Sequence, residues 1–180
     1  MTRSRVLCRT SQALLVLGSL VTFAAPSAAQ YATQTVALSG GPLMPRASLS
    51  DSLKSGYHLT AGLGFHFGDH LSMRLEGMYE QFARKAVTSP SNLQMYGFTG
   101  NLEIIPLGLS GPYLVGGWGY YQTAKSGTVP ASKFEPGINY GAGWRLFTKR
   151  FSVFAEARVH QVQGGSGKPA SMPIALGIRV

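Results

Sequence analysis

The stretch SGYHLTAGLGFHF, from Ser55 to Phe67, decides the fold class of this sequence. From Tyr57 onward an apolar residue occupies every second position, and glycine, threonine or histidine stands between. Successive side chains of a β-strand point to opposite faces, so this alternation predicts a strand with one apolar face and one small or polar face. A soluble β-sandwich buries the apolar face, whereas a transmembrane barrel turns it toward lipid. The rest of the chain must decide between them.

The composition of the 180-residue chain suits a single domain with a lipid-facing exterior. Charged residues make up 13% of it, against roughly 25% in an ordinary soluble domain. Glycine is abundant, with 23 residues, and the mean hydropathy is slightly positive at +0.07. Disorder requires low hydrophobicity and high charge, so this composition excludes a disordered chain.

Residues 1–29 have the three parts of a secretory signal peptide. MTRSR is basic, residues 13–25 form an apolar run, and SAA at 27–29 provides the small residues of a cleavage site. The run is too short to cross the roughly 30 Å bilayer core as a helix. We therefore expect a signal peptide over 1–29 and a barrel domain over 30–180. Cleavage would remove three arginines, lowering the net charge from +9 to +6, and would remove Cys8, the single cysteine.

The mature chain contains further segments that read as strands. The sequence predicts eight of them, at 31–40, 55–67, 70–80, 93–105, 112–122, 134–147, 151–160 and 171–180. Long connections are expected at 42–54, 83–92, 123–133 and 161–170, and short ones at 68–70, 107–111 and 148–150. An even number of strands joined alternately by long and short connections is typical of outer-membrane barrels.

The length of the opening strand supports the same conclusion. The ten-residue span from Tyr57 to Phe67 is about 33 Å long at about 3.3 Å per residue. A tilt of about 40° reduces its height to about 25 Å, the height of the apolar band in such barrels. We therefore expect an all-β fold, an eight-stranded antiparallel up-and-down transmembrane β-barrel whose apolar face points outward. For the strand at 112–122 both faces are apolar or glycine, and we favour Leu114, Trp118 and Tyr120 as outward.

Four segments resemble a known family. They are YGFTGNLEIIP, GPYLVGGWGYY, INYGAGWRLFTKRFSVFAEARVH and the terminal MPIALGIRV. They are similar to the small outer-membrane β-barrel domain family of Gram-negative bacteria, whose members include opacity-type and eight-stranded, porin-like proteins. The resemblance implies a location in the cell outer membrane and insertion by the barrel-assembly machinery through the C-terminal strand. Such barrels commonly end in phenylalanine, whereas this chain ends in Val180.

Alternation along the strands places eight charged residues on inward faces. They are Arg74, Glu76, Glu80, Glu103, Arg145, Glu156, Arg158 and Arg179. An eight-stranded barrel has room inside only for side chains, and a buried charge without a partner is costly. We therefore expect an ion-pair network that fills the lumen; the alternative is a polar path for ions. On the outward face we expect an aromatic girdle of Tyr57, Phe65, Phe67, Tyr79, Trp118, Trp144 and Phe151.

The sequence offers little for catalysis or for metal binding. His58, His66 and His160 are expected on the lumenal side, but their spacing does not bring together the three or four ligands that zinc requires. A nucleophile, a base and an orienting group, as an enzyme needs, are not found together. We therefore predict no catalytic residue, no metal, no cofactor and no enzymatic activity.

Basic residues concentrate in the expected loops. They are Arg46, Lys54, Arg84, Lys85, Lys125, Lys133 and Lys168. They could attract phosphate-rich lipopolysaccharide or another anionic partner at the cell surface, or be ordinary solvated charges. Because they are spread over the loops of an exported protein, they do not indicate nucleic-acid binding.

The expected function is that of an integral outer-membrane barrel with a side-chain-filled lumen. Its role would be structural or in surface interaction, as in adhesion or envelope maintenance, and it would be a monomer in contact with outer-membrane lipid and lipopolysaccharide. Two functional alternatives are a small porin-like channel and a lipid-modifying barrel enzyme. A soluble periplasmic barrel is the structural alternative.

Overall fold

The computed structural model describes residues 32–85, 92–108, 110–125, 133–148, 150–163 and 170–180. The signal peptide expected over residues 1–29 lies outside these ranges. In the described part of the chain, no helix has both the length and the apolar character needed to cross a membrane.

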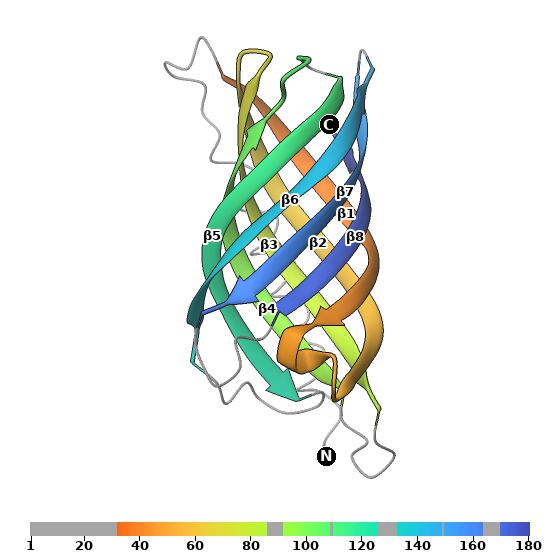
Figure 1. Ribbon diagram of the computed structural model, residues 1–180. Coiled ribbons are helices and arrows are strands. Elements are labelled where there is room, and N and C mark those ends of the chain that lie inside the picture. Colours follow the sequence, from red (N-terminus) through yellow and green to blue (C-terminus); the bar gives the residue numbers. More distant parts are fainter. Residues whose placement is uncertain (1–31, 86–91, 109, 126–132, 149, 164–169) are drawn as a thin grey trace, which may run out of the picture. The chain divides into compact units, whose positions relative to one another are not determined.

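Eight antiparallel strands, in chain order, form one closed barrel (Figure 1). They are β1 (Ala32–Arg46), β2 (Leu53–Phe67), β3 (Leu71–Arg84), β4 (Leu93–Ile104), β5 (Gly111–Lys125), β6 (Glu135–Phe147), β7 (Ser152–Val162) and β8 (Ala170–Arg179). Each strand pairs with the next, and β8 pairs with β1, so no strand edge is left open. The predicted fold class is confirmed.

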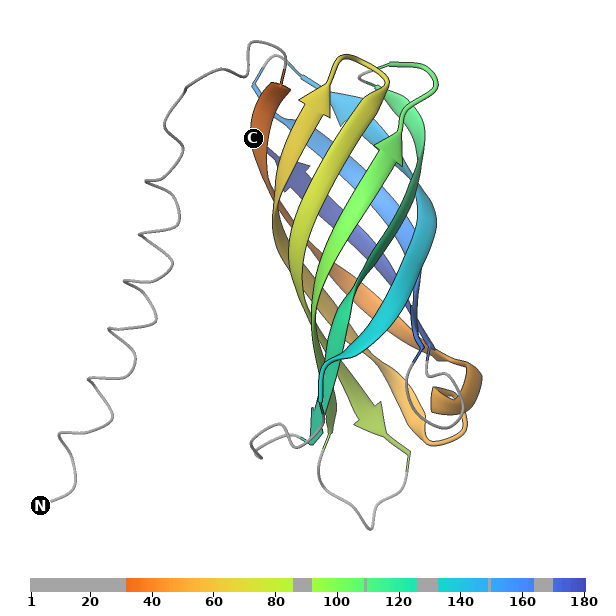
Figure 2. The ribbon, with the colours of Figure 1, turned by 90° about the vertical axis from the view of Figure 1, so that its left-hand side faces the viewer.

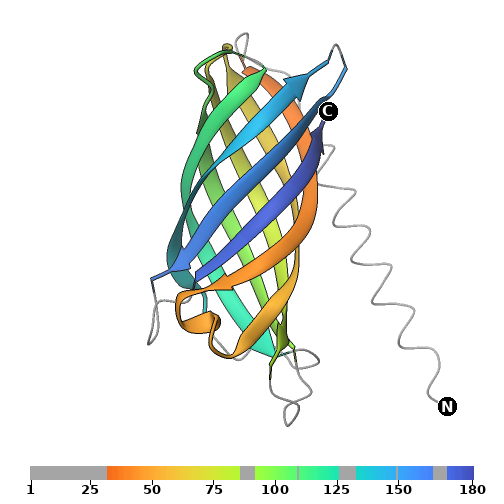
Figure 3. The ribbon, with the colours of Figure 1, turned by 45° about the vertical axis from the view of Figure 1, so that its right-hand side comes forward.

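The barrel closes where β8 lies between β7 and β1 (Figure 3). β1 pairs with β8 from Ala37 to Gly40 and again from Leu43 to Arg46. Pro42 falls in the gap between the two paired segments, because proline has no backbone N–H to donate. Beyond β8, Val180 exchanges two backbone hydrogen bonds with Val36, of 2.7 and 2.9 Å. The last residue of the chain is therefore part of the closure.

Successive connections alternate between the two ends of the barrel. The connections 68–70, 105–110 and 148–151 share the end drawn at the top of Figure 2. Gly68 has a φ of +73°, a left-handed conformation that allows the tight turn from β2 to β3. In outer-membrane barrels the short turns are periplasmic and the longer loops extracellular. We therefore call the end with the connections 68–70, 105–110 and 148–151 the periplasmic end, and the opposite end the extracellular end.

The connection between the first two strands is shorter than the sequence indicated. A long loop was expected over 42–54, but β1 continues to Arg46 and β2 begins at Leu53, with a 3-10 helix at Ala47–Leu49 between them. The polar character of this segment favoured a loop. The strands extend because Leu43 and Leu53 face inward and pack against Phe82, which buries all three.

The apolar face of each strand points away from the lumen. In β2, Leu59 and Leu63 are 52% and 46% exposed, whereas His58, on the opposite face of the strand, is 0% exposed. In β5, Leu114, Trp118 and Tyr120 are exposed, whereas Tyr113, Val115 and Tyr121 on the other face are buried, which confirms the favoured orientation. The interior of this protein is therefore its polar side.

Candidate functional site

The lumen contains all eight charged residues that alternation placed on inward faces. β3 supplies three of them, β7 supplies two, and β4, β6 and β8 supply one each. None is more than 5% exposed. Charges on five strands are thereby brought together inside a narrow space.

Arg74 of β3 lies at the centre of this group. Its Nε is 3.0 Å from Glu76 Oε1, its Nη1 is 3.2 Å from Glu103 Oε1, and its Nη2 donates to Glu156 Oε2 at 2.7 Å. One face of the guanidinium lies 5.6 Å from the centre of the Phe154 ring. A planar guanidinium can serve three carboxylates at once because its five N–H groups point in fixed directions.

Arg158 joins two of the same carboxylates from the opposite side of the lumen. Its Nη1 donates to Glu76 Oε2 at 2.6 Å, and its Nε contacts Glu156. Neutral donors provide further hydrogen bonds to both carboxylates: Asn101 Nδ2 donates to Glu76 at 2.7 Å, and the Tyr113 hydroxyl donates to Glu156 at 2.8 Å. Both glutamates therefore have charged and uncharged hydrogen-bond partners, as buried carboxylates require.

Glu103 of β4 holds the part of the network nearer the periplasmic end. Arg179 binds it through two hydrogen bonds, of 2.9 and 3.1 Å, and Arg145 contacts its Oε2. The Arg145 guanidinium also lies 5.2 Å from the centre of the Tyr113 ring. Among the described residues, Glu103 is the one carboxylate paired with Arg145 or Arg179. Two arginines thus depend on this glutamate.

Glu80 forms a separate group with two histidines, toward the extracellular end. His160 Nδ1 is 2.9 Å from Glu80 Oε1, and His58 Nδ1 is 3.3 Å from the same oxygen. His66, the third histidine expected in the lumen, lies elsewhere, 3.4 Å from Arg179. Within the described residues, no group of three or more His, Cys, Asp or Glu side chains could hold a metal ion.

Apolar clusters lie beyond the charged network at the extracellular end and beside it toward the periplasmic end. At the extracellular end, Leu43, Leu53 and Phe82 form one cluster. A second cluster there consists of Met78, Met95, Tyr121 and Val162, and a third, toward the periplasmic end, of Ile105, Tyr113, Val115 and Phe154. These buried apolar clusters were not expected from the sequence. Met78 and Phe82 have the same parity as Arg74 and Glu80, and that signal could have placed them inside.

The residues expected to form the aromatic girdle lie on the outer wall at different heights. Tyr57 and Tyr79 lie toward the extracellular ends of their strands, with ring centres 5.8 Å apart. Phe65, Phe67, Trp144 and Phe151 lie toward the periplasmic end. Trp118 lies in the middle of β5, and its ring centre is 4.7 Å from that of Tyr120.

Several solved structures have a similar fold. Neisserial surface protein A (NspA) is 16% identical, with a TM-score of 0.64, and the alignment covers 83% of this chain and 97% of that one. The N-terminal β-barrel domain of Pseudomonas aeruginosa OprF is 12% identical, with a TM-score of 0.50 and coverages of 83% and 99%. Yersinia pestis outer membrane protein Ail, in a phospholipid bilayer nanodisc, is 13% identical, with a TM-score of 0.51 and coverages of 82% and 100%.

At these identities the similarity shows the fold alone. Among curated proteins, none matches the sequence. The family described as outer membrane protein beta-barrel domain, by contrast, matches residues 15–178, which is most of the chain. With the closed eight-stranded barrel and its lipid-facing exterior, this match shows that the chain belongs to the outer membrane protein beta-barrel domain family and resides in the cell outer membrane.

Proposed function

We propose that this protein is a closed outer-membrane barrel with a structural or surface-interaction role in the envelope, and that it neither conducts ions nor catalyses a reaction. The observation that carries this proposal is the filling of the lumen. Arginine and glutamate side chains from five strands pair across it, and buried apolar clusters lie toward both ends.

A conducting path would have to pass through these ion pairs. Arg145, Glu103 and Arg74 form a continuous chain of contacts, which Glu156 extends to Arg158. Separating a buried, hydrogen-bonded pair costs roughly 3–5 kcal/mol, so an ion cannot displace several pairs at thermal energy. A channel instead needs a lumen in which water replaces side chains, as in barrels with more strands.

Export and assembly form part of the same proposal. We propose that residues 1–29 are removed after Ala29 and that the barrel-assembly machinery recognises β8, whose outward residues Ile174, Leu176 and Ile178 alternate with inward ones. The mature protein is a monomer and does not bind nucleic acid. Mass spectrometry of the exported protein should then give a chain that begins at Gln30.

A role at the cell surface is supported by the charge at the extracellular end. Arg46, Lys54 and Lys85 are exposed there, and Lys133, just before β6, is exposed as well. Such positive charge attracts anionic molecules over roughly a Debye length, about 8 Å at physiological ionic strength. The similar barrel NspA is, by its name, a surface protein.

Conductance in planar lipid bilayers tests the closed lumen. The refolded protein should give no discrete current steps, while the double variant Arg74→Ser/Arg158→Ser, which removes two large side chains from the network, should give brief steps if it folds. A steady open state of the unmodified protein would contradict the proposal and favour the porin-like channel. Conversion of vesicle lipids during the same incubation, detected by mass spectrometry, would instead favour a lipid-modifying enzyme.

A further inference from the structure

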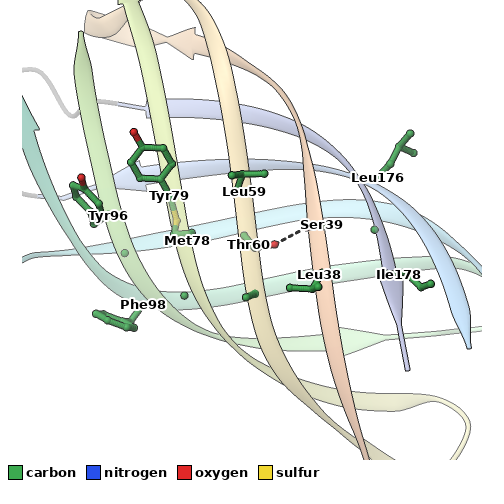
Figure 4. A pocket seen from close by; sticks show the side chains of 14 residues that line it. Leu38, Ser39, Leu59, Thr60, Met78, Tyr79, Tyr96, Phe98, Leu176 and Ile178 are labelled. Atoms are coloured by element: carbon green, nitrogen blue, oxygen red, sulfur yellow. Dashed lines mark hydrogen bonds between the residues drawn. The ribbon is translucent and has the colours of Figure 1, made fainter. Parts of the chain in front are cut away.

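The outer wall of the barrel contains an apolar groove over β8, β1, β2, β3 and β4, with a volume of about 900 Å³ (Figure 4). Its floor lies where the paired outward residues Ala61 and Gly77 are small, so that the backbone is uncovered. Larger side chains border it, among them Leu38, Phe98 and Leu176. The groove faces lipid, because large side chains that border it, such as Leu59 and Phe98, belong to the outward, exposed face. Ser39, Thr60 and Met78, which are buried on the lumenal side, also line it.

A polar belt of tyrosine and glutamine runs along the extracellular side of the groove. The hydroxyls of Tyr57 and Tyr79 both donate to Gln81 Oε1, at 3.0 and 2.6 Å. Gln94 Nε2 donates to the Tyr79 hydroxyl at 3.0 Å, and the Tyr96 hydroxyl donates back to Gln94 at 3.1 Å. Tyrosine rings with hydrogen-bonded hydroxyls lie at the level of lipid headgroups. The groove therefore begins at the outer membrane surface and continues into the hydrocarbon region.

Beyond this belt, the ends of β1, β2 and β3 carry a cluster of positive charge. Residues 46–54 and 84–85 contain four basic residues and one acidic residue, Asp51, which leaves an excess of three positive charges. Arg46, Lys54 and Lys85 are exposed, and Lys85 Nζ donates to the backbone carbonyl of Ser50 at 2.6 Å. We call Arg46, Lys54, Arg84 and Lys85 the basic tip.

We propose that the groove, the belt and the basic tip form one binding site for a phosphorylated lipid of the outer leaflet, of the lipopolysaccharide class. The phosphates bind the basic tip, the sugar and amide groups contact the tyrosine and glutamine belt, and one acyl chain occupies the groove. A multiply phosphorylated lipid matches an excess of several positive charges, whereas a zwitterionic phospholipid does not. This inference rests on the outward face and the outer-membrane location, and it does not depend on a closed lumen.

Glycine positions on the outer wall allow a matched test of the groove. A Cβ added at Gly77 would have its nearest neighbours, Ala61 O and Phe98 Cε1, at 4.0 Å, so a larger side chain can start there without a clash, and Gly77→Leu extends into the groove. Gly116 of β5 is exposed on the same wall outside the groove, and a Cβ there would meet nothing within 4 Å. Gly116→Leu is therefore the control. Ala61→Leu fills the groove from the neighbouring strand and replaces Gly77→Leu if that variant does not fold.

Native mass spectrometry of the refolded barrel, released from detergent micelles, measures the binding directly. The probes are bisphosphorylated hexa-acyl lipid A, its monophosphorylated form and phosphatidylethanolamine, and the heat-dependent gel shift verifies folding of each variant. The unmodified barrel should retain lipid A in preference to the monophosphorylated form, and that form in preference to phosphatidylethanolamine. Retention of phosphatidylethanolamine as tight as that of lipid A would overturn the proposal.

The variants separate the acyl-chain contact from the charge contact. Leucine at position 77 displaces about two methylene groups, each contributing a factor of about four, so Gly77→Leu should weaken lipid A binding about fifteenfold. Lys54→Gln and Lys85→Gln should each weaken it about fivefold, and less at high salt. Gly116→Leu should leave it unchanged. Equal binding by the Gly77→Leu and Gly116→Leu variants, or a dimer of barrels that forms through the groove in place of lipid binding, would overturn the proposed site.

Discussion

Replacement of Glu103 by glutamine should be the most destabilising single charge removal in the lumen. The substitution keeps the size of the side chain but leaves Arg145 and Arg179 without a carboxylate partner in the described part of the chain. Removing one partner of a buried ion pair costs about 3–5 kcal/mol of folding free energy. Because Glu103→Gln leaves two arginines without a partner, its cost should be at the upper end of this range, about 5 kcal/mol. Glu156→Gln should cost less, about 3 kcal/mol, because both of its arginines still contact Glu76.

Urea unfolding in phospholipid vesicles, followed by tryptophan fluorescence, gives these free energies. The chain has two tryptophans, Trp118 and Trp144, both on the outer wall, so their emission changes when the strands leave the lipid. Asp51→Asn is the control, since it removes an equal charge from an exposed position. Its effect should stay within about 0.5 kcal/mol, as for most exposed charges.

A second substitution tests whether the loss of stability comes from the unpaired arginine charges. Adding Arg145→Met to Glu103→Gln should recover part of the stability, and the double-mutant cycle should give a coupling of more than about 1 kcal/mol. If Glu103→Gln were as mild as Asp51→Asn, the lumen would contain enough water to solvate both arginines. The ion-pair network would then not be dry.

Further predictions concern the outer wall and the packing of the lumen. Leu63→Arg, on the lipid-facing side, should destabilise the barrel by about 2–4 kcal/mol and depend on bilayer thickness, whereas Gly62→Arg should act by crowding the lumen; equal thickness dependence of the two would contradict the assigned faces. Gly177→Ala should cost about 1–3 kcal/mol by overpacking, because its Cβ would lie 2.3 Å from Phe154 Cζ. Gly116→Ala, with nothing within 4 Å, should change stability by less than about 0.5 kcal/mol in the same urea titration; equal losses would refute the packing argument.

The fold could be predicted from sequence because a strand in a barrel has one face toward lipid and one toward side chains. Alternation in β3 and β7 was enough to orient these strands, and it placed residues such as Arg74 and Glu156 inside. The strand ends were predicted less well. A loop is expected to begin at Pro42, but the apolar contacts of Leu43 with Leu53 and Phe82 continue the strand beyond it.

Alternation and similar mid-strand positions predict that Arg74, Glu76, Glu156 and Arg158 pair across the lumen, and ion pairs between β3 and β7 are present. They do not predict that Arg145 and Arg179 both pair with Glu103, because this depends on the stagger of all the strands between β4, β6 and β8. The groove was missed for a related reason, since Ala61 and Gly77 are unremarkable until the register of β2 and β3 places them side by side. Face assignment is a property of one strand, whereas pairing and grooves are properties of the closed sheet.

The apolar face of this barrel points to lipid and the polar face to the interior. Fluorescence quenching of the unmodified protein in vesicles tests this orientation directly, because Trp118 and Trp144 are 50% and 55% exposed on the outer wall. Brominated phospholipids should quench most of the tryptophan emission, and iodide in the water should quench little of it. Strong quenching by iodide with little effect of the brominated lipids would mean that this wall faces water, and would contradict the account.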